Sequence, residues 1–186
     1  MANFGLSLSK LFRPGIEGRY SNVKGDSGGE TYCGVARNYH GDWNGWILID
    51  TAKDLNAKPD LNGNGLFNSL LPFLQDFYRV KFWYAIKGDR LDSQPLADFL
   101  FACAVNMNTP QAVKLLQRSL GITADGIFGD KTLATVNGAG ESALARLADQ
   151  ARAFYEKIGT GEKQKFLKGW MNRVAAYATM DGSAVA

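Results

Sequence analysis

The chain of 186 residues has little of what metal or redox chemistry requires. It holds one histidine, His40, and two cysteines, Cys33 and Cys103, which are too far apart in sequence for the short spacings of a zinc site. One histidine also leaves a His-based catalytic triad with a single possible member. Two distant cysteines do not make a disulfide-stapled secreted domain, so we expect two free, buried thiols. We expect no metal and no cofactor.

Long apolar segments and clusters of one charge are also missing. The longest apolar run, residues 95–107, is interrupted by Asp98 and is too short to span a bilayer, so stable membrane insertion is not expected. The N-terminus lacks the apolar core and cleavage site of a Sec signal, which predicts synthesis in the cytoplasm. The net charge of +3 falls after Thr109. This mildly basic half suits an anionic partner, but the excess can also come from ordinary lysines on a solvated surface. No motif in the sequence favours nucleic acid.

The run Asp60–Gly65 has the spacing of the first half of an EF-hand calcium loop. Leu71 stands at the twelfth position, where a bidentate glutamate is needed. We therefore expect a turn rich in Asx residues and not a calcium site.

Amphipathic spacing at the period of an α-helix dominates the rest of the sequence. It occurs at residues 4–12, 70–78, 144–158 and 166–177, while residues 95–107 are apolar on nearly every face and are expected to form a core helix. Asp50, Thr109 and Asp130 are each expected to cap a helix that follows. The sequence predicts a mainly α fold of two lobes that share helices, with one small β-hairpin region near residues 19–36.

Catalytic side chains are often presented by a glycine-rich loop on a helical scaffold, and the stretch after Pro14 is such a loop. It offers the carboxylates Glu17, Asp26 and Glu30 and the hydroxyl of Thr31. Glycoside hydrolysis needs two carboxyl groups, one protonated and one ionised. In a strand that begins near Glu30, neighbouring side chains point to opposite faces, so Glu30 and Thr31 cannot both face a cleft. From these residues alone, a carboxylate pair in a glycine loop is more often turn chemistry than catalysis.

The run E-G-x-Y-x-N-x(3)-D-x-G-G-E-T-x-x-G-V, from Glu17 to Val35, resembles glycoside hydrolase family 108. Segments 77–83, 99–107, 115–133 and 166–174 resemble the same family in the same order, and the second half resembles its peptidoglycan-binding module. The resemblance implies a lysozyme-like fold with a catalytic region at 1–92, a helical peptidoglycan-binding-like region at 93–181 and a tail at 182–186. It also implies cleavage of the β-1,4 bond between N-acetylmuramic acid and N-acetylglucosamine in bacterial peptidoglycan.

Carried over residue by residue, the resemblance makes Glu17 the general acid, Asp26 the second carboxylate and Thr31 a hydroxyl that positions water or substrate. Four residues separate Asp26 from Thr31, where phage-type lysozymes have five. The roles of Asp26 and Thr31 are therefore supported by a less close match than the role of Glu17. Arg19 replaces a glycine that is usual in the family, and we expect its side chain to point into solvent.

Six further residues are candidates for substrate binding. Aromatic rings stack well on the apolar faces of sugars, although core packing is an equal alternative for each aromatic residue. The six are Tyr20, Asn22, Glu30, Tyr39, Trp43 and Trp46.

Two other functions fit the same sequence. One is a non-catalytic protein that binds the cell wall or activates secretion, since members of the family also carry that label; it would have no need of an acid beside a glycine loop. The other is a lytic transglycosylase, which would use Glu17 without hydrolytic water. An endolysin-like enzyme that lacks a Sec signal would need a holin, another export system or lysis to reach the cell wall or periplasm.

Overall fold

The structure is a computed structural model that describes residues 1–13, 18–24 and 26–178. Within these residues the chain forms eight α-helices and one three-stranded antiparallel sheet. The predicted mainly α, lysozyme-like fold with a small β region near residues 19–36 is confirmed. The chain divides into two compact units, Leu8–Val80 and a second that combines Met1–Ser7 with Lys81–Ala186. Helix α1 (Phe4–Leu11) passes from one unit into the other.

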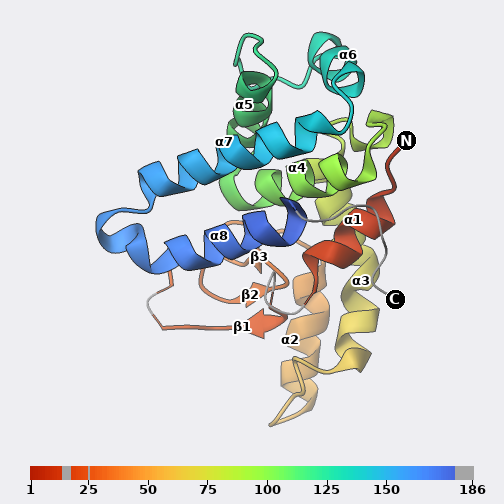
Figure 1. Cartoon of the computed structure of the whole chain (residues 1–186). Helices are drawn as coiled ribbons and strands as arrows, with labels where there is room; N and C mark the ends of the chain where they lie inside the picture. Colours follow the sequence, from red (N-terminus) through yellow and green to blue (C-terminus); the bar gives the residue numbers. More distant parts are fainter. Residues whose placement is uncertain (14–17, 25, 179–186) are drawn as a thin grey trace. The chain divides into compact units, whose positions relative to one another are not determined.

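The unit Leu8–Val80 packs two helices, α2 (Gly45–Leu55) and α3 (Asn64–Tyr78), against each other beside the small sheet. The sheet has the order β1 (Tyr20–Ser21), β2 (Thr31–Tyr32) and β3 (Val35–Ala36), as Figure 1 shows. Tyr20 pairs with Tyr32, and Thr31 with Ala36. The buried Tyr78 hydroxyl donates a hydrogen bond of 2.6 Å to the carbonyl of Cys33, which ties α3 to the turn after β2.

Helix α2 begins six residues earlier than expected. Asp50 lies in the middle of this helix and does not cap it, so that prediction was wrong. The helix begins at Gly45 because Trp46 and Ile49 extend its buried face toward the N-terminus. A side chain on Gly45 would meet the Trp43 ring at 2.3 Å, so this first position accepts only glycine.

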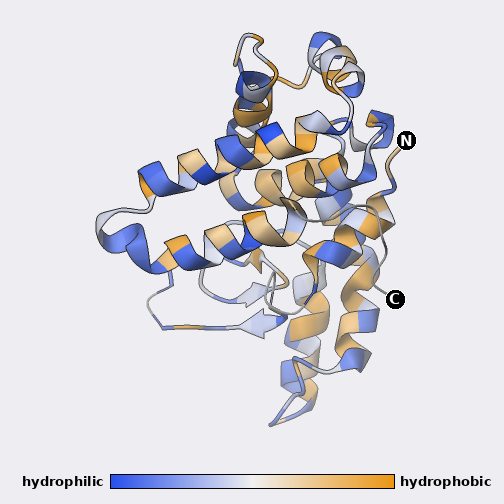
Figure 2. Cartoon of the chain, viewed as in Figure 1, coloured by the Kyte–Doolittle hydropathy of each residue, from blue (hydrophilic) through white to orange (hydrophobic). Residues whose placement is uncertain are grey.

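The second unit is built around α4 (Gln94–Met107), in which every residue from Leu96 to Ala104 is buried. Helices α5 (Thr109–Ser119), α7 (Ser142–Ile158) and α8 (Gln164–Ala178) pack against α4. Figure 2 shows α4 as a largely apolar helix, whereas the others carry polar faces. The remaining elements of this unit are α6 (Asp130–Gly138), the π-helix η1 (Arg79–Trp83), which begins in the other unit, and the 3-10 helices η2 (Gly88–Arg90) and η3 (Gly161–Lys163).

Two of the predicted caps in this unit were wrong. Asn108, and not Thr109, caps α5: its side chain accepts a hydrogen bond of 3.0 Å from the backbone N–H of Gln111. Asp130 is the first residue of α6, and its side chain is bound by Lys87 at 2.7 Å and Arg90 at 3.3 Å. Basic neighbours that are distant in sequence therefore occupy the carboxylate that local spacing had assigned to a cap.

The first seven residues belong to the second unit. The N–H of Ala2 donates to the carbonyl of Leu91 at 2.7 Å, and the Phe4 ring lies 5.6 Å from that of Trp83. The Ser7 hydroxyl donates to the fully buried Asp98 carboxylate at 2.6 Å, and Gln94 donates to the same oxygen. Asp98, which interrupts the apolar run of α4, is thus satisfied by hydrogen bonds, as a buried carboxylate must be.

Cys33 and Cys103 are both buried thiols outside any disulfide, as predicted. Burial raises the pKa of the Cys103 thiol to about 12, which keeps it protonated. Among the described residues, no helix is long and apolar enough to cross a membrane.

Candidate active site

The predicted catalytic loop is described from Gly18 onward except at Gly25, so Glu17 lies outside the described residues. Asp26 and Thr31 are brought together around Gly28. The Asp26 carboxylate accepts a hydrogen bond of 2.9 Å from the Gly28 N–H, which closes a tight turn. A Cβ placed on the buried Gly28 would lie 3.5 Å from Asp26 Oδ1, 3.8 Å from Thr31 Oγ1 and 3.0 Å from Ala36 Cβ. The carboxylate and the hydroxyl therefore flank the same face of Gly28, and a larger residue there would press on both.

Glu30 points away from this pair. Its side chain is only 11% exposed, and three side chains bind its carboxylate. The Tyr20 hydroxyl donates at 2.7 Å, Arg37 Nε lies 2.7 Å from the other oxygen, and the Lys53 ammonium makes a close contact. The predicted division of Glu30 and Thr31 between two faces agrees with this arrangement, in which Thr31 instead contacts the carbonyl of Gly29 at 3.4 Å.

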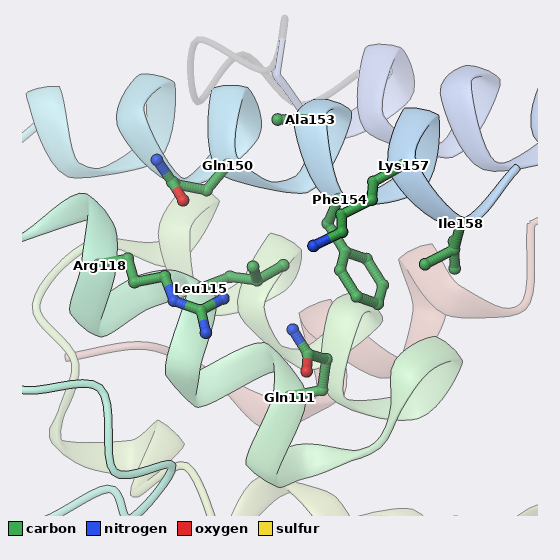
Figure 3. A pocket seen from close by; sticks show the side chains of 8 residues that line it. All are labelled: Gln111, Leu115, Arg118, Gln150, Ala153, Phe154, Lys157 and Ile158. Atoms are coloured by element: carbon green, nitrogen blue, oxygen red, sulfur yellow. The ribbon is translucent and has the colours of Figure 1, made fainter.

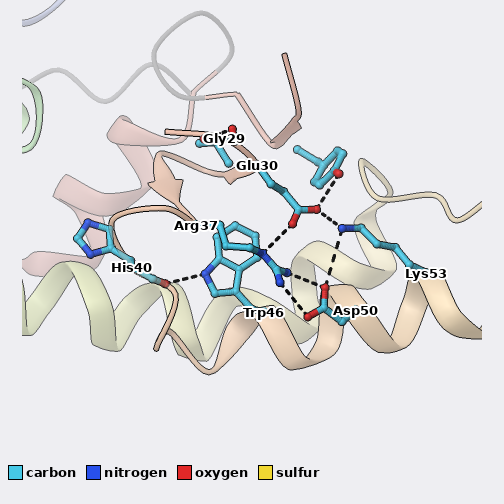
Figure 4. A network of polar contacts seen from close by, with 9 residues as sticks. Gly29, Glu30, Arg37, His40, Trp46, Asp50 and Lys53 are labelled. Atoms are coloured by element: carbon cyan, nitrogen blue, oxygen red, sulfur yellow. Dashed lines mark hydrogen bonds and ion pairs between the residues drawn. The ribbon is translucent and has the colours of Figure 1, made fainter. Parts of the chain in front are cut away.

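The contacts of Glu30 continue into helix α2, as Figure 4 shows. Arg37 donates two hydrogen bonds to Asp50, at 2.6 and 3.0 Å, and its guanidinium lies 4.3 Å from the centre of the Trp46 ring. Lys53, one turn beyond Asp50, contacts Glu30. Two carboxylates alternate with two cations, so this ion-pair network fastens the glycine loop and β3 to α2.

The network keeps Glu30 ionised. Burial raises the pKa of a carboxyl group and is the largest single influence on Glu30, but it is outweighed. Hydrogen bonds from Lys53 and Tyr20 and the charges of Lys53 and Arg37 together hold the pKa of Glu30 below its ordinary value. The same burial, together with the charge of Glu30, raises the pKa of Tyr20. An ionised, enclosed carboxylate cannot serve as a general acid at neutral pH.

The aromatic candidates separate by exposure. Trp43 and Trp46 are 8% and 3% exposed, and their ring nitrogens donate to the carbonyls of Phe73 and His40, so both take the core-packing alternative. Tyr39 is 64% exposed. Its hydroxyl donates at 3.0 Å to Ser27, the residue beside Asp26. Tyr39 therefore places an open aromatic face next to the Asp26–Thr31 pair.

Of the two polar motif residues, Asn22 is exposed after β1, whereas the Tyr20 hydroxyl is occupied by Glu30. The side chain of Arg19 does not point into solvent, as was expected, but contacts other residues. Its guanidinium donates to the carbonyl of Asn62 at 2.5 Å and to Asn64 Oδ1 at 2.8 Å. It also lies 4.6 Å from the centre of the Phe67 ring. Arg19 thus fastens the start of β1 to the turn at residues 60–65, whose carbonyl and amide oxygens supply the acceptors.

Sequence reasoning missed Arg37, Asp50 and Lys53. The three-residue spacing of Asp50 and Lys53 on one helix was a visible signal of an ion pair. Starting the helix at Asp50 hid that signal, and no local pattern linked Arg37 to either residue. Within the described residues, no group of three or more His, Cys, Asp or Glu side chains is placed to hold a metal ion.

Residues 14–107, which contain the glycine loop and its ion-pair network, match the sequence profile of the family described as Glycosyl hydrolase 108. The chain belongs to this family. Residues 111–175 of this glycosyl hydrolase 108 protein match a second profile, described as Predicted Peptidoglycan domain. The resemblance noted in the sequence is thus confirmed over both halves.

A solved structure with a similar fold is that of SagA from Brucella abortus. Its sequence is 26% identical to the present one, with a TM-score of 0.68, and the alignment covers 95% of this chain and 91% of SagA. No characterised protein in the curated set matches this sequence. The two family stretches adjoin between residues 107 and 111. Helix α4 lies within the hydrolase stretch, while α5 to α8 fall largely in the peptidoglycan stretch. The boundaries expected at residues 92 and 181 stay predictions.

Proposed function

We propose that this glycosyl hydrolase 108 protein is an N-acetylmuramidase. It hydrolyses the β-1,4 bond between N-acetylmuramic acid and N-acetylglucosamine in peptidoglycan, with Glu17 as the general acid. The observation that carries the proposal is the pairing of Asp26 with Thr31 across Gly28, beside the exposed ring of Tyr39. Glu17, Asp26 and Thr31 all lie in the stretch that matches the hydrolase family.

Each residue of the pair has a chemical role in this proposal. Asp26 is an exposed carboxylate that, among the described residues, accepts one backbone N–H, so it retains lone pairs for a water molecule or for positive charge that develops on the sugar. The Thr31 hydroxyl, on the same face of Gly28, positions that water. Glu17 supplies the proton to the leaving oxygen. Tyr39 and Asn22 are the exposed candidates for contacts to the sugar, and Glu30 acts as a positioning residue through its ion pairs.

The test is a digest of purified peptidoglycan followed by mass spectrometry of the products. Reducing muramic acid ends are expected, and anhydro ends would identify a lytic transglycosylase instead. Glu17→Gln and Asp26→Asn should each lower the rate of hydrolysis by at least about a hundredfold, because each removes a group that stabilises the transition state, by proton transfer or by charge. Asp42→Asn changes an exposed carboxylate outside the catalytic pair and is the matched control. A Glu17→Gln variant as fast as the parent would contradict the assignment.

The match of residues 111–175 to a peptidoglycan domain favours one alternative, a wall-binding or secretion-activating protein without catalysis. That alternative predicts binding to insoluble peptidoglycan with no soluble products from the parent protein. In either case the protein acts at the bacterial cell wall or periplasm, and an endolysin-like role would require delivery by a holin, an export system or lysis. Cosedimentation with peptidoglycan, measured beside product release, separates binding from cleavage.

A further inference from the structure

A groove with a volume of about 360 Å³ lies between α5 and α7, inside the stretch that matches the peptidoglycan domain. This volume is at the lower end of the range of small-ligand sites, roughly 300–1,000 Å³. Leu115 from α5 and Phe154 and Ile158 from α7 give it an apolar floor. Four polar side chains reach over that floor from the two helices, as Figure 3 shows: Gln111, Arg118, Gln150 and Lys157.

The charge of this groove is of one sign. Arg118 and Lys157 both line it, and none of its lining residues is acidic. Among the residues that the structure describes, neither cation takes part in an ion pair, although Lys87, Arg90 and Arg152 of the same unit do. The amides of Gln111 and Gln150 flank the two cations with further hydrogen-bond donors. An anionic group that enters between the helices would therefore contact two cations that are not already in ion pairs with described residues, and two amides.

We propose that this groove binds the peptide stem of peptidoglycan through its free carboxylate. The proposal rests on the proposed function, since it takes peptidoglycan as the substrate. Glycan strands present uncharged hydroxyl and acetamido groups, which the amides of Gln111 and Gln150 can hydrogen-bond. Such groups carry no negative charge for Arg118 and Lys157. A stem peptide presents a terminal carboxylate for Arg118 and Lys157. The small methyl groups of its alanines fit the apolar floor at Leu115 and Phe154.

The test is a calorimetric titration of the full chain with each of three probes, which measures the affinity of each probe. The probes are diacetyl-lysyl-D-alanyl-D-alanine, the same peptide with a carboxamide terminus, and tetra-N-acetylchitotetraose. The free acid is expected to bind, and the carboxamide to bind roughly tenfold or more weakly, because it carries no charge for the two cations. The double variant Arg118→Gln, Lys157→Gln should lose a similar factor. Arg146→Gln, Lys168→Gln removes the same charge from exposed positions of α7 and α8 outside the groove and should bind as the parent does.

Other results would overturn the proposal. Equal binding of acid and carboxamide, full binding by the Arg118 and Lys157 double variant, or no binding of the free acid at millimolar concentration would each do so. Digestion of purified peptidoglycan by the same preparations tests the proposed function separately. Digestion without peptide binding would support the muramidase proposal and contradict the stem-peptide proposal. Peptide binding without digestion would support the stem-peptide proposal and contradict the muramidase proposal. Because Arg118 and Lys157 are exposed, both double variants should melt like the parent.

Discussion

At the scale of single residues, Glu30 shows that membership of a motif does not make a carboxylate available to a ligand. It stands one residue before Thr31 in the glycine loop, yet its oxygens are bound by Tyr20, Arg37 and Lys53. Such a carboxylate stabilises the loop in its charged form. Asp26, which is exposed and bound by one backbone N–H, is the acidic residue that the described part of the loop leaves open to solvent.

Glu30→Gln is expected to destabilise the protein by roughly 1.5–3 kcal/mol at pH 7, since it removes the charged acceptor that Tyr20, Arg37 and Lys53 share. The pKa of Glu30 is lower in the folded than in the unfolded chain. The stabilisation is therefore complete above the unfolded pKa, roughly 4.3, and is lost as the pH falls through the folded value. Urea denaturation of parent and variant at pH 7 and at pH 3 measures both effects.

The control for this measurement is Glu156→Gln, which neutralises an exposed carboxylate on α7. Its free energy of unfolding should differ from that of the parent by less than about 0.5 kcal/mol. A Glu30→Gln variant whose deficit is the same at both pH values would show that packing, and not the ionised carboxylate, accounts for the loss.

Tyr39→Ala tests the exposed aromatic face beside Asp26. If the ring stacks on a sugar of the substrate, its removal should raise KM by roughly three- to tenfold and leave the melting temperature unchanged, because the side chain is 64% exposed. Tyr39→Phe keeps the ring and should retain the parent KM. Tyr84→Ala removes another exposed tyrosine, 53% exposed in the other unit, and controls for a general surface effect. An unchanged KM for Tyr39→Ala would exclude stacking at this position.

At the scale of elements, the loop between α5 and α6 is held by one buried side chain from α5. Gln117 is 1% exposed. Its amide nitrogen donates to Asp125 at 2.7 Å and to the carbonyl of Ile127 at 3.1 Å, and its oxygen accepts from the N–H of Gly126 at 2.9 Å. Gly126 has a φ of +83°, a backbone conformation that favours glycine. Both polar ends of Gln117 are therefore satisfied inside the loop that it supports.

Gln117→Leu keeps the approximate volume and removes these hydrogen bonds. The part-buried N–H of Gly126 then loses its acceptor, which should lower the free energy of unfolding by about 1–3 kcal/mol. Chemical denaturation of the variant checks this value. Gln75→Leu, a substitution at an exposed position of α3, is the control and should be close to neutral. A neutral Gln117→Leu would show that water replaces the lost partners.

Helix periodicity allowed much of the fold to be predicted, because a buried apolar face repeats along the sequence at α7 and α8, and an almost continuous apolar run marks α4. The helix starts were less predictable. Asp130 has the spacing of a cap but is bound by Lys87 and Arg90, which are more than 39 residues away in sequence. In the candidate site, the loop residues were visible as a motif, whereas the ion pairs of Arg37 depend on tertiary contacts that no local spacing reports.

At the scale of the whole molecule, α4 is covered by three other helices of its own unit, α5, α7 and α8. Removing residues 110–186 takes away nearly all of α5 and the whole of α7 and α8, and exposes the buried run Leu96–Ala104. We expect the fragment 1–109 to show no cooperative thermal transition and to have no muramidase activity, because α4 lacks a partner to bury its apolar surface. Circular dichroism melts and turbidity assays check this. A soluble, cooperatively melting and active fragment would show that the peptidoglycan stretch is an independent domain.

The docking of Met1–Ser7 onto residues that follow Lys81 has a consequence for the order in which the newly made chain can fold. Asn3 exchanges hydrogen bonds with Gln94, 91 residues later in the sequence. At roughly 5–20 residues per second, Asn3 is synthesised about 5–20 s before that partner. For most of this interval Phe4 has neither Trp83 nor Phe101 to pack against. Residues 1–7 therefore lack these partners, and are open to capture by chaperones, until the residues that follow Lys81 have been synthesised.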